Sequence, residues 1–215
     1  MTPARRLPRP FLRCGLASVA LTLAAVLVAP LPAVTEEPGT TTWEELRSEE
    51  GKLIVWMPGK ATYTEVPGNA PGVVLHTWLL KREDGVIIAV SWSDVAKAED
   101  AASVVPDVVL EACKKGFLSS LKINKATTEK STVSGCPALL VTSDPGERID
   151  MTTRIVQAGI RTYQVAVAGA RGKVDASLCR KVLESFKVLD ERKIVGMKKE
   201  KEPEKDDESL TEEDK

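Results

Sequence analysis

Few residues of this sequence have the types and spacing that catalysis requires. His76 is the only histidine among 215 residues, so any histidine-activated nucleophile has to use it. Cys136 is the partner to consider, because a neighbouring imidazole can hold a thiol as the reactive thiolate. However, His76 stands within an apolar segment, and Gly135 and Pro137 around the cysteine are typical of a hairpin. The residues favour a packed histidine in a non-catalytic protein; a thiol-dependent or small-ligand enzyme using Cys136 and His76 is the alternative.

Two further clusters could bind ions. Asp144, Glu147 and Asp150 place three carboxylates within seven residues, which suits a hard cation such as calcium, although the spacing is not that of an EF-hand. The segment 169–173 has two glycines and two bases before a predicted helix, whose N-terminus could hold an anion, but it matches no glycine-rich nucleotide motif. We interpret these as a solvated turn and a helix lead-in, and predict no catalytic, cofactor-binding or metal-binding residue.

The tryptophans and cysteines complete the set. Four tryptophans could line a ligand groove, but three fall in predicted strands, where core packing is their expected role: Trp43, Trp56, Trp78 and Trp92. Beyond Cys14 the chain has Cys113, Cys136 and Cys179, at spacings that match no zinc motif. An odd number leaves at least one thiol outside any disulfide. We predict small buried side chains with at most one bridge, whose pairing stays open.

The elements that position these residues are mostly strands. Runs of β-branched and aromatic residues predict four of them before the first helix, at 52–58, 61–66, 73–81 and 86–93. The loop 82–85 ends in Asp-Gly, which is a strong hairpin signal. Four more strands are predicted at 125–133, 136–143, 149–157 and 161–168, with Ser134-Gly135 and Ala158-Gly159 as turns.

Two segments have helical periodicity instead. Between residues 104 and 121 apolar side chains recur every four positions, at Val105, Val109, Cys113, Phe117 and Leu121. The second helix is predicted at 176–186, with Asp175 as the N-cap. Because hairpins connect consecutive strands, we predict an α+β fold: a mainly antiparallel sheet of about six to eight strands, sandwiched with two principal helices.

The N-terminus has the composition of an export signal. Arginines precede an uncharged apolar run, Gly15 to Ala29, which is followed by Pro30, Pro32 and the small residue Ala33. The run has 15 residues, whereas a membrane-spanning helix needs about 20. We therefore predict a cleaved signal peptide at 1–33, with an uncleaved membrane tether as the alternative. The mature protein would be secreted or periplasmic.

Charge defines the rest of the organisation. Residues 51–190 are predicted to form one domain with 18 Lys and Arg against 15 Asp and Glu, a balance that argues against a nucleic-acid partner. Residues 34–50 form a linker and lead-in. The tail at 191–215 is rich in charge, with five bases and nine acids from Lys198 onward, and is expected to be disordered because it has too little apolar surface to bury.

Several phrases of the sequence resemble a known family. They are WEELRSEEGKLIVWMPGK (43–60), SGCPALLV (134–141), RIVQAGIRTYQVAVAG (154–169) and LCRKVLESFKV (178–188). They resemble small exported bacterial proteins of PsbP-like fold, in which helices sandwich an antiparallel sheet. The resemblance implies a non-enzymatic assembly or binding factor, the class to which an extrinsic subunit of photosystem II belongs. The matching phrases are structural, so they transfer no functional residue.

Together these observations predict an exported, non-catalytic binding or assembly module without a cofactor. Its partner would be a protein or a component of the cell envelope. A membrane contact is expected only if the signal segment stays uncleaved.

Overall fold

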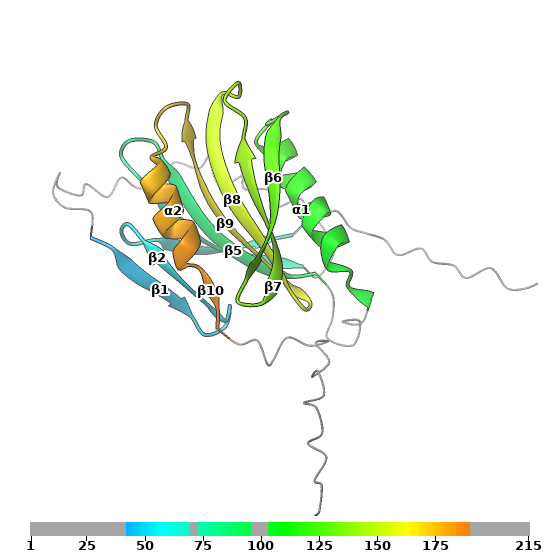
Figure 1. Cartoon of the computed structure of the whole chain (residues 1–215). Helices are drawn as coiled ribbons and strands as arrows, with labels where there is room; N and C mark the ends of the chain where they lie inside the picture. The colour runs from blue at the N-terminus through cyan, green and yellow to red at the C-terminus, as the bar shows by residue number, and fades with distance from the viewer. Residues whose placement is uncertain (1–41, 69–72, 96–102, 190–215) are drawn as a thin grey trace, which may run out of the picture.

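The computed structural model describes residues 42–68, 73–95 and 103–189 (Figure 1). The predicted signal peptide, the linker up to residue 41 and the predicted tail at 191–215 lie outside the described residues. No helix in the described ranges is both long and apolar enough to cross a membrane.

The main sheet has seven antiparallel strands, which confirms the predicted α+β fold class. Its spatial order is β3 (Thr62–Pro67), β4 (Val74–Lys81), β5 (Ile87–Asp94), β9 (Arg161–Ala170), β8 (Ile149–Ala158), β7 (Cys136–Ser143) and β6 (Ala126–Val133). Strands β4 and β5 form the predicted Asp-Gly hairpin, and Gly85 has a φ of 82° in its loop. In the β6–β7 turn Ser134 and Gly135 both have positive φ, 50° and 77°, as a two-residue hairpin with right-handed strand twist requires.

A second, small sheet contains β1 (Glu44–Ser48), β2 (Leu53–Met57) and β10 (Lys187–Val188). Strand β1 lies in the segment expected to be lead-in, so the folded part begins before residue 51. Strand β2 was expected in the main sheet, but it pairs with β1 and, through Leu53 opposite Val188, with the end of the described chain. Short local patterns cannot reveal a pairing between residues so far apart in sequence.

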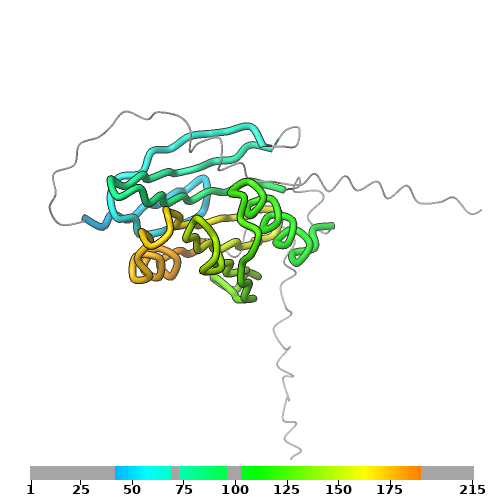
Figure 2. The backbone as a smooth tube through the Cα atoms, turned by 90° about the horizontal axis from the view of Figure 1, so that it is seen from above, coloured from blue at the N-terminus to red at the C-terminus, as the bar shows by residue number. Residues whose placement is uncertain are grey.

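The two helices cover opposite faces of the main sheet. Helix α1 (Pro106–Ser120) packs on β7 and β8, and α2 (Ala176–Ser185) packs on β2, β8 and β9. Figures 1 and 2 show α2 next to the small sheet and α1 well away from both. The Asp175 carboxylate accepts from the backbone N–H of Ser177, as predicted for the N-cap. Val105, expected in the buried stripe of α1, is 56% exposed because it is the cap residue before the helix.

Two apolar clusters follow from this arrangement. The cluster under α2 joins the inward side chains of β2 to those of the sheet and includes Leu53, Val55, Val90, Val165, Val182 and Phe186. The cluster under α1 includes Leu110, Cys113, Phe117, Leu139, Met151 and Ile155. Alternation along β8 and β9 sends neighbouring residues to opposite clusters, so both faces are buried along most of β9 and along the second half of β8, whereas Asp150, Thr152 and Arg154 of β8 are half-buried.

Candidate functional site

The two residues proposed for thiol catalysis lie far apart. His76 is on β4, and Cys136 begins β7, with β5, β9 and β8 between these strands. Four inter-strand steps correspond to roughly 19 Å, well beyond the reach of a hydrogen bond. Cys136 is fully buried in the cluster under α2, and its thiol lies 3.7 Å from the Ser134 carbonyl oxygen. The fold therefore does not assemble a Cys136–His76 pair.

His76 is a packed residue with a fixed orientation. Its ring stacks on Trp92 with 3.7 Å between centroids and 5° between planes. The Tyr63 hydroxyl donates to a Glu65 oxygen at 2.8 Å and lies 2.7 Å from Nδ1 of His76. The Tyr63 hydroxyl has a single proton, which it donates to Glu65. Its oxygen therefore accepts a hydrogen bond from the Nδ1–H group of His76. Desolvation and the Glu65 carboxylate raise the pKa of Tyr63 to about 12.

Arg161 stacks on the other face of Trp92 and contacts the loop before β2 of the small sheet. The Arg161 guanidinium lies 3.9 Å from the centroid of the Trp92 ring. Its Nε and Nη2 donate to the two oxygens of Asp94 at 2.7 and 2.9 Å. Its Nη1 donates to the Glu50 carbonyl oxygen at 2.7 Å, and the Tyr163 hydroxyl donates to that of Gly51 at 2.8 Å. This set ties the loop before β2 to the main sheet and has a structural role.

The three cysteines are buried and no disulfide joins them, so the prediction of small buried side chains is confirmed. Cys113 faces the cluster under α1, whereas Cys136 and Cys179 belong to the cluster under α2. Burial raises the pKa of the Cys113 thiol to about 11, although a hydrogen bond with Thr162 opposes the shift. Protonated, enclosed thiols are poor nucleophiles.

These shifts predict that the protein loses stability in alkali. Burial raises the pKa of Cys113 from 9.0 to about 11 and that of Tyr163 from 10.0 to about 12. Between pH 9 and 12 the unfolded chain therefore releases protons that the folded chain retains, and the free energy of unfolding falls as pH rises. Urea denaturation at pH 8, 10 and 11 measures this fall. Cys113→Ala and Tyr163→Phe should each reduce its slope; a free energy of unfolding independent of pH over this range would contradict it.

The acidic turn does not gather its carboxylates. Asp144 accepts from the Thr127 hydroxyl at 3.3 Å, and Glu147 accepts from the backbone N–H groups of Asn124 and Lys125 at 3.0 and 2.8 Å. Asp150 accepts instead from the backbone N–H of Gly172. Each carboxylate thus holds a different piece of backbone or side chain. Within the described ranges, no group of three or more His, Cys, Asp and Glu side chains could hold a metal ion.

The N-terminus of α2 offers no anion site either. The Asp175 side chain already occupies the first turn, where its oxygens accept from the backbone N–H and hydroxyl of Ser177 at 2.9 and 2.6 Å. These hydrogen bonds lower the pKa of Asp175. A bound anion would meet this carboxylate.

The four tryptophans line no common groove. Trp92 is core, and Trp56 is 41% exposed on the outer face of the small sheet. The Lys181 ammonium lies 3.8 Å from the centroid of the Trp43 ring, and the Trp78 ring packs at a tilt of 45° against Tyr63 with 5.0 Å between centroids. The printed contacts of these rings are with different partners, as expected for structural residues.

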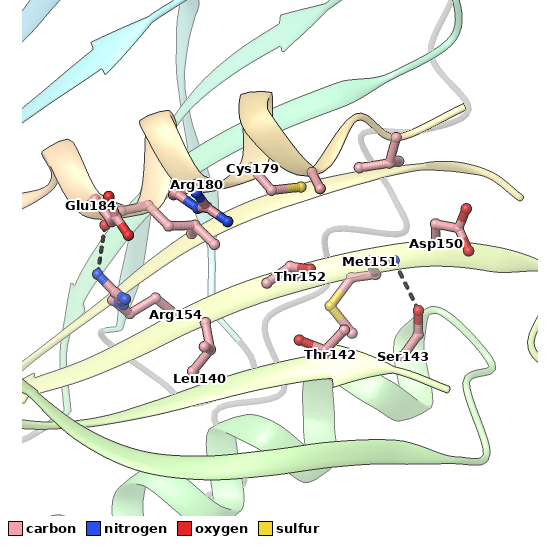
Figure 3. Close-up of a pocket in the computed structure, with 13 residues that line it drawn as sticks. Leu140, Thr142, Ser143, Asp150, Met151, Thr152, Arg154, Cys179, Arg180 and Glu184 are labelled. Atoms are coloured by element: carbon pink, nitrogen blue, oxygen red, sulfur yellow. Dashed lines mark hydrogen bonds between the residues drawn. The ribbon is translucent and has the colours of Figure 1, made fainter. Parts of the chain in front are cut away.

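A groove of about 390 Å³ lies between α2 and the adjoining strands β7 and β8 (Figure 3). The cross-strand pairs Leu140–Arg154 and Thr142–Thr152 form its floor. The floor is open because α2 packs over β8 and β9 and leaves the outer part of β7 uncovered. The full lining is Leu140, Thr142, Ser143, Asp150, Met151, Thr152, Arg154, Val174, Ala176, Cys179, Arg180, Leu183 and Glu184.

Helix α2 supplies the wall of the groove in two rows. Cys179 and Leu183 are buried one turn apart, and Ala176, Arg180 and Glu184 form an exposed row beside them. The Cys179 thiol faces Thr152 of the floor; burial raises its pKa, while a hydrogen bond with Thr152 opposes the rise. The groove therefore combines apolar surface from Leu140, Cys179 and Leu183 with charged side chains on its floor and rim.

Arg154 is the distinctive residue of the floor. Its Nη1 donates to the carbonyl oxygen of Leu183 at 2.7 Å, in the last turn of α2. Its Nε is buried and has no hydrogen-bond partner among the described residues. Desolvation lowers the pKa of Arg154, and the Glu184 carboxylate only opposes that shift. A partly desolvated cation in an open groove is a group that can bind an anion.

Sequence reasoning did not single out this groove. Its residues come from segments between 140 and 184 that were correctly predicted as strands and helix, but whose relative placement is tertiary. One local signal existed: alternation puts Arg154 on the same strand face as Val156, which points to an inward-facing cation in an otherwise buried strand.

Among known proteins, similarity to this chain is found only at the level of solved structures. No family model matches the chain, and no curated protein matches it. The solution structure of cyanobacterial PsbP (CyanoP) from Synechocystis sp. PCC 6803 is similar, with 17% sequence identity and a TM-score of 0.42. The match covers 74% of this chain and 99% of that chain. At this identity and TM-score the match assigns no site and no role, so the assignment of a site depends on the geometry of the groove.

Proposed function

We propose that this protein is an exported, non-catalytic binding or assembly module, and that its groove beside α2 holds a segment of a partner. The groove is the observation that carries the proposal: an apolar centre with convergent polar groups is the usual form of a binding site. Export is supported by the basic and apolar N-terminal segment of the sequence.

The chemistry of the lining favours binding over catalysis. Its titratable side chains are Asp150, Arg154, Cys179, Arg180 and Glu184. The thiol has a raised pKa and no imidazole beside it, since His76, the only histidine, lies on β4. Guanidinium and carboxylate groups on the rim suit recognition of a charged partner. The thiol-enzyme alternative loses support because the fold separates Cys136 from His76.

Site-specific photo-crosslinking tests this function. A photoreactive amino acid replaces Thr142, which is exposed in the groove, and the same change at Thr132, exposed on the opposite face of β6, is the matched control. We expect crosslinking in an envelope fraction to give a discrete product from position 142 and not from 132. Ala176→Trp, which fills the rim of the groove, should abolish the product while leaving the circular dichroism spectrum unchanged.

Two results would contradict the proposal. One is the same set of products from both positions, which would indicate non-specific contact. The other is a position-142 product that persists at full yield in the Ala176→Trp variant, because the partner would then lie outside the groove.

A further inference from the structure

The Arg154 guanidinium has donor capacity that the fold does not use. One of its five N–H groups reaches the Leu183 carbonyl oxygen, and the buried Nε has no partner. No carboxylate in the described ranges lies within the 4.0 Å limit of an ion pair with Arg154. The bond to Leu183 explains why a cation sits at the end of α2. It leaves Nη2 without a hydrogen-bond partner among the described residues, and this nitrogen, unlike the enclosed Nε, is the donor that a ligand in the groove can reach.

Arg180, on the helical wall, brings a second guanidinium to the same end of the groove as Arg154 on the floor. It is exposed on α2, and no described carboxylate pairs with it within the same 4.0 Å limit. Figure 3 shows Arg154 on the strand and Arg180 on the helix towards one end, with Asp150 at the other. Two unpaired guanidinium groups therefore face one space from two elements.

The acids of the groove do not cancel this charge. Asp150 lies at the far end and accepts from the Gly172 backbone N–H. Glu184 stands at the arginine end, but it is exposed and forms no ion pair there within 4.0 Å. The arginine end thus carries two positive charges against one negative charge. Leu140 and Leu183 add apolar surface beside them.

We infer that the groove recognises an acidic segment of a partner protein, through a carboxylate bound by Arg154 and Arg180 and an apolar neighbour packed on Leu140. The inference rests on the proposed function and specifies its ligand. A planar guanidinium matches a carboxylate with two parallel hydrogen bonds, which a lysine cannot reproduce. The groove is open to solvent, since four of its lining residues are exposed: Thr142, Ala176, Arg180 and Glu184. An extended protein segment can therefore lie along it, with its ends outside the groove.

The probe for this inference is a displayed library of random dodecapeptides, selected on the full chain. We expect the selected peptides to be enriched in Asp or Glu next to Leu, Ile, Val or Phe. The affinity of one such peptide should fall about tenfold or more in Arg154→Lys, which keeps the charge and a donor for Leu183, and should also fall in Arg180→Gln. Arg47→Gln, an exposed change on β1, is the control and should not alter it.

A double-mutant cycle separates recognition of the carboxylate from loss of structure. Replacing the peptide's acid by its amide should cost as much affinity as Arg154→Lys, and the two losses should not add. Additive losses, or selected peptides with no acidic enrichment, would overturn the inference. Saturable binding of inorganic phosphate without selection of acidic peptides would overturn it in favour of an oxyanion site. If the Thr142 crosslink still forms in these cases, the proposed function stands and only its ligand is wrong.

Discussion

Replacing Phe117 with alanine is expected to lower the free energy of unfolding by about 3–5 kcal/mol. Phe117 is fully buried at the centre of the cluster between α1 and the main sheet, together with Leu110, Leu139 and Ile155. Truncation removes most of its apolar contact area and leaves a cavity that the strands cannot close, because β7 and β8 are held by pairing on both sides. The loss should fall on the whole domain, since α1 covers its face of these strands.

Urea denaturation followed by circular dichroism measures this loss. Val108→Ala on the same helix is the matched control: Val108 is 44% exposed, so its truncation should change the free energy of unfolding by no more than about 0.5 kcal/mol. Equal effects of the two substitutions would show that α1 does not pack on the sheet through Phe117.

The second large effect is expected from Arg161→Met, at about 2–4 kcal/mol. The substitution removes the bidentate pair with Asp94, the bond to the Glu50 carbonyl oxygen and the stacking on Trp92. It also leaves the Asp94 carboxylate without its counter-ion. The loss should loosen the small sheet first, because the Glu50 contact joins the loop before β2 to β9.

Hydrogen exchange and urea denaturation together test this prediction. Amides of β1 and β2 should exchange faster in Arg161→Met than amides of β8, in addition to the fall in the free energy of unfolding. Arg47→Met, whose ion pairs with Glu45 and Glu49 are exposed, should cost no more than about 1 kcal/mol. Uniform exchange across both sheets would mean that Arg161 does not hold the small sheet in place.

Local chemistry accounts for the elements that sequence reasoning found. A two-residue hairpin turn requires positive φ at both positions, and Ser134 and Gly135 adopt it between two strands of alternating pattern. Helix α2 begins at Ala176 because Asp175 caps it, and its apolar spacing follows one face. The buried cysteines fit the same logic, since each sits at an apolar position of its own element. Such signals extend over a few residues and are visible in a single sequence.

The predictions that were wrong, for Val105 and for the pairing of β2, have a common cause: they depend on contacts between segments distant in sequence. Val105 fits the helical period of α1, but it precedes the first turn and none of the described elements covers it. Strand β2 has the composition of a central strand because it is buried against the main sheet, yet its hydrogen-bond partners are β1 and β10. Composition reports burial, whereas pairing depends on which strand edges meet.

The same distinction between local and long-range contacts applies to the candidate site. The sequence by itself determined which residue types are present: one histidine, few reactive groups, three cysteines beyond the predicted signal peptide and a strand-rich domain with two helices. Tertiary structure alone decided how these residues combine. It set His76 and Cys136 on strands separated by three others, and it placed Arg154 on the floor and Arg180 on the wall of one groove. The reason is physical: a strand or helix follows from contacts within a few residues, but a site is formed by side chains that only packing brings together.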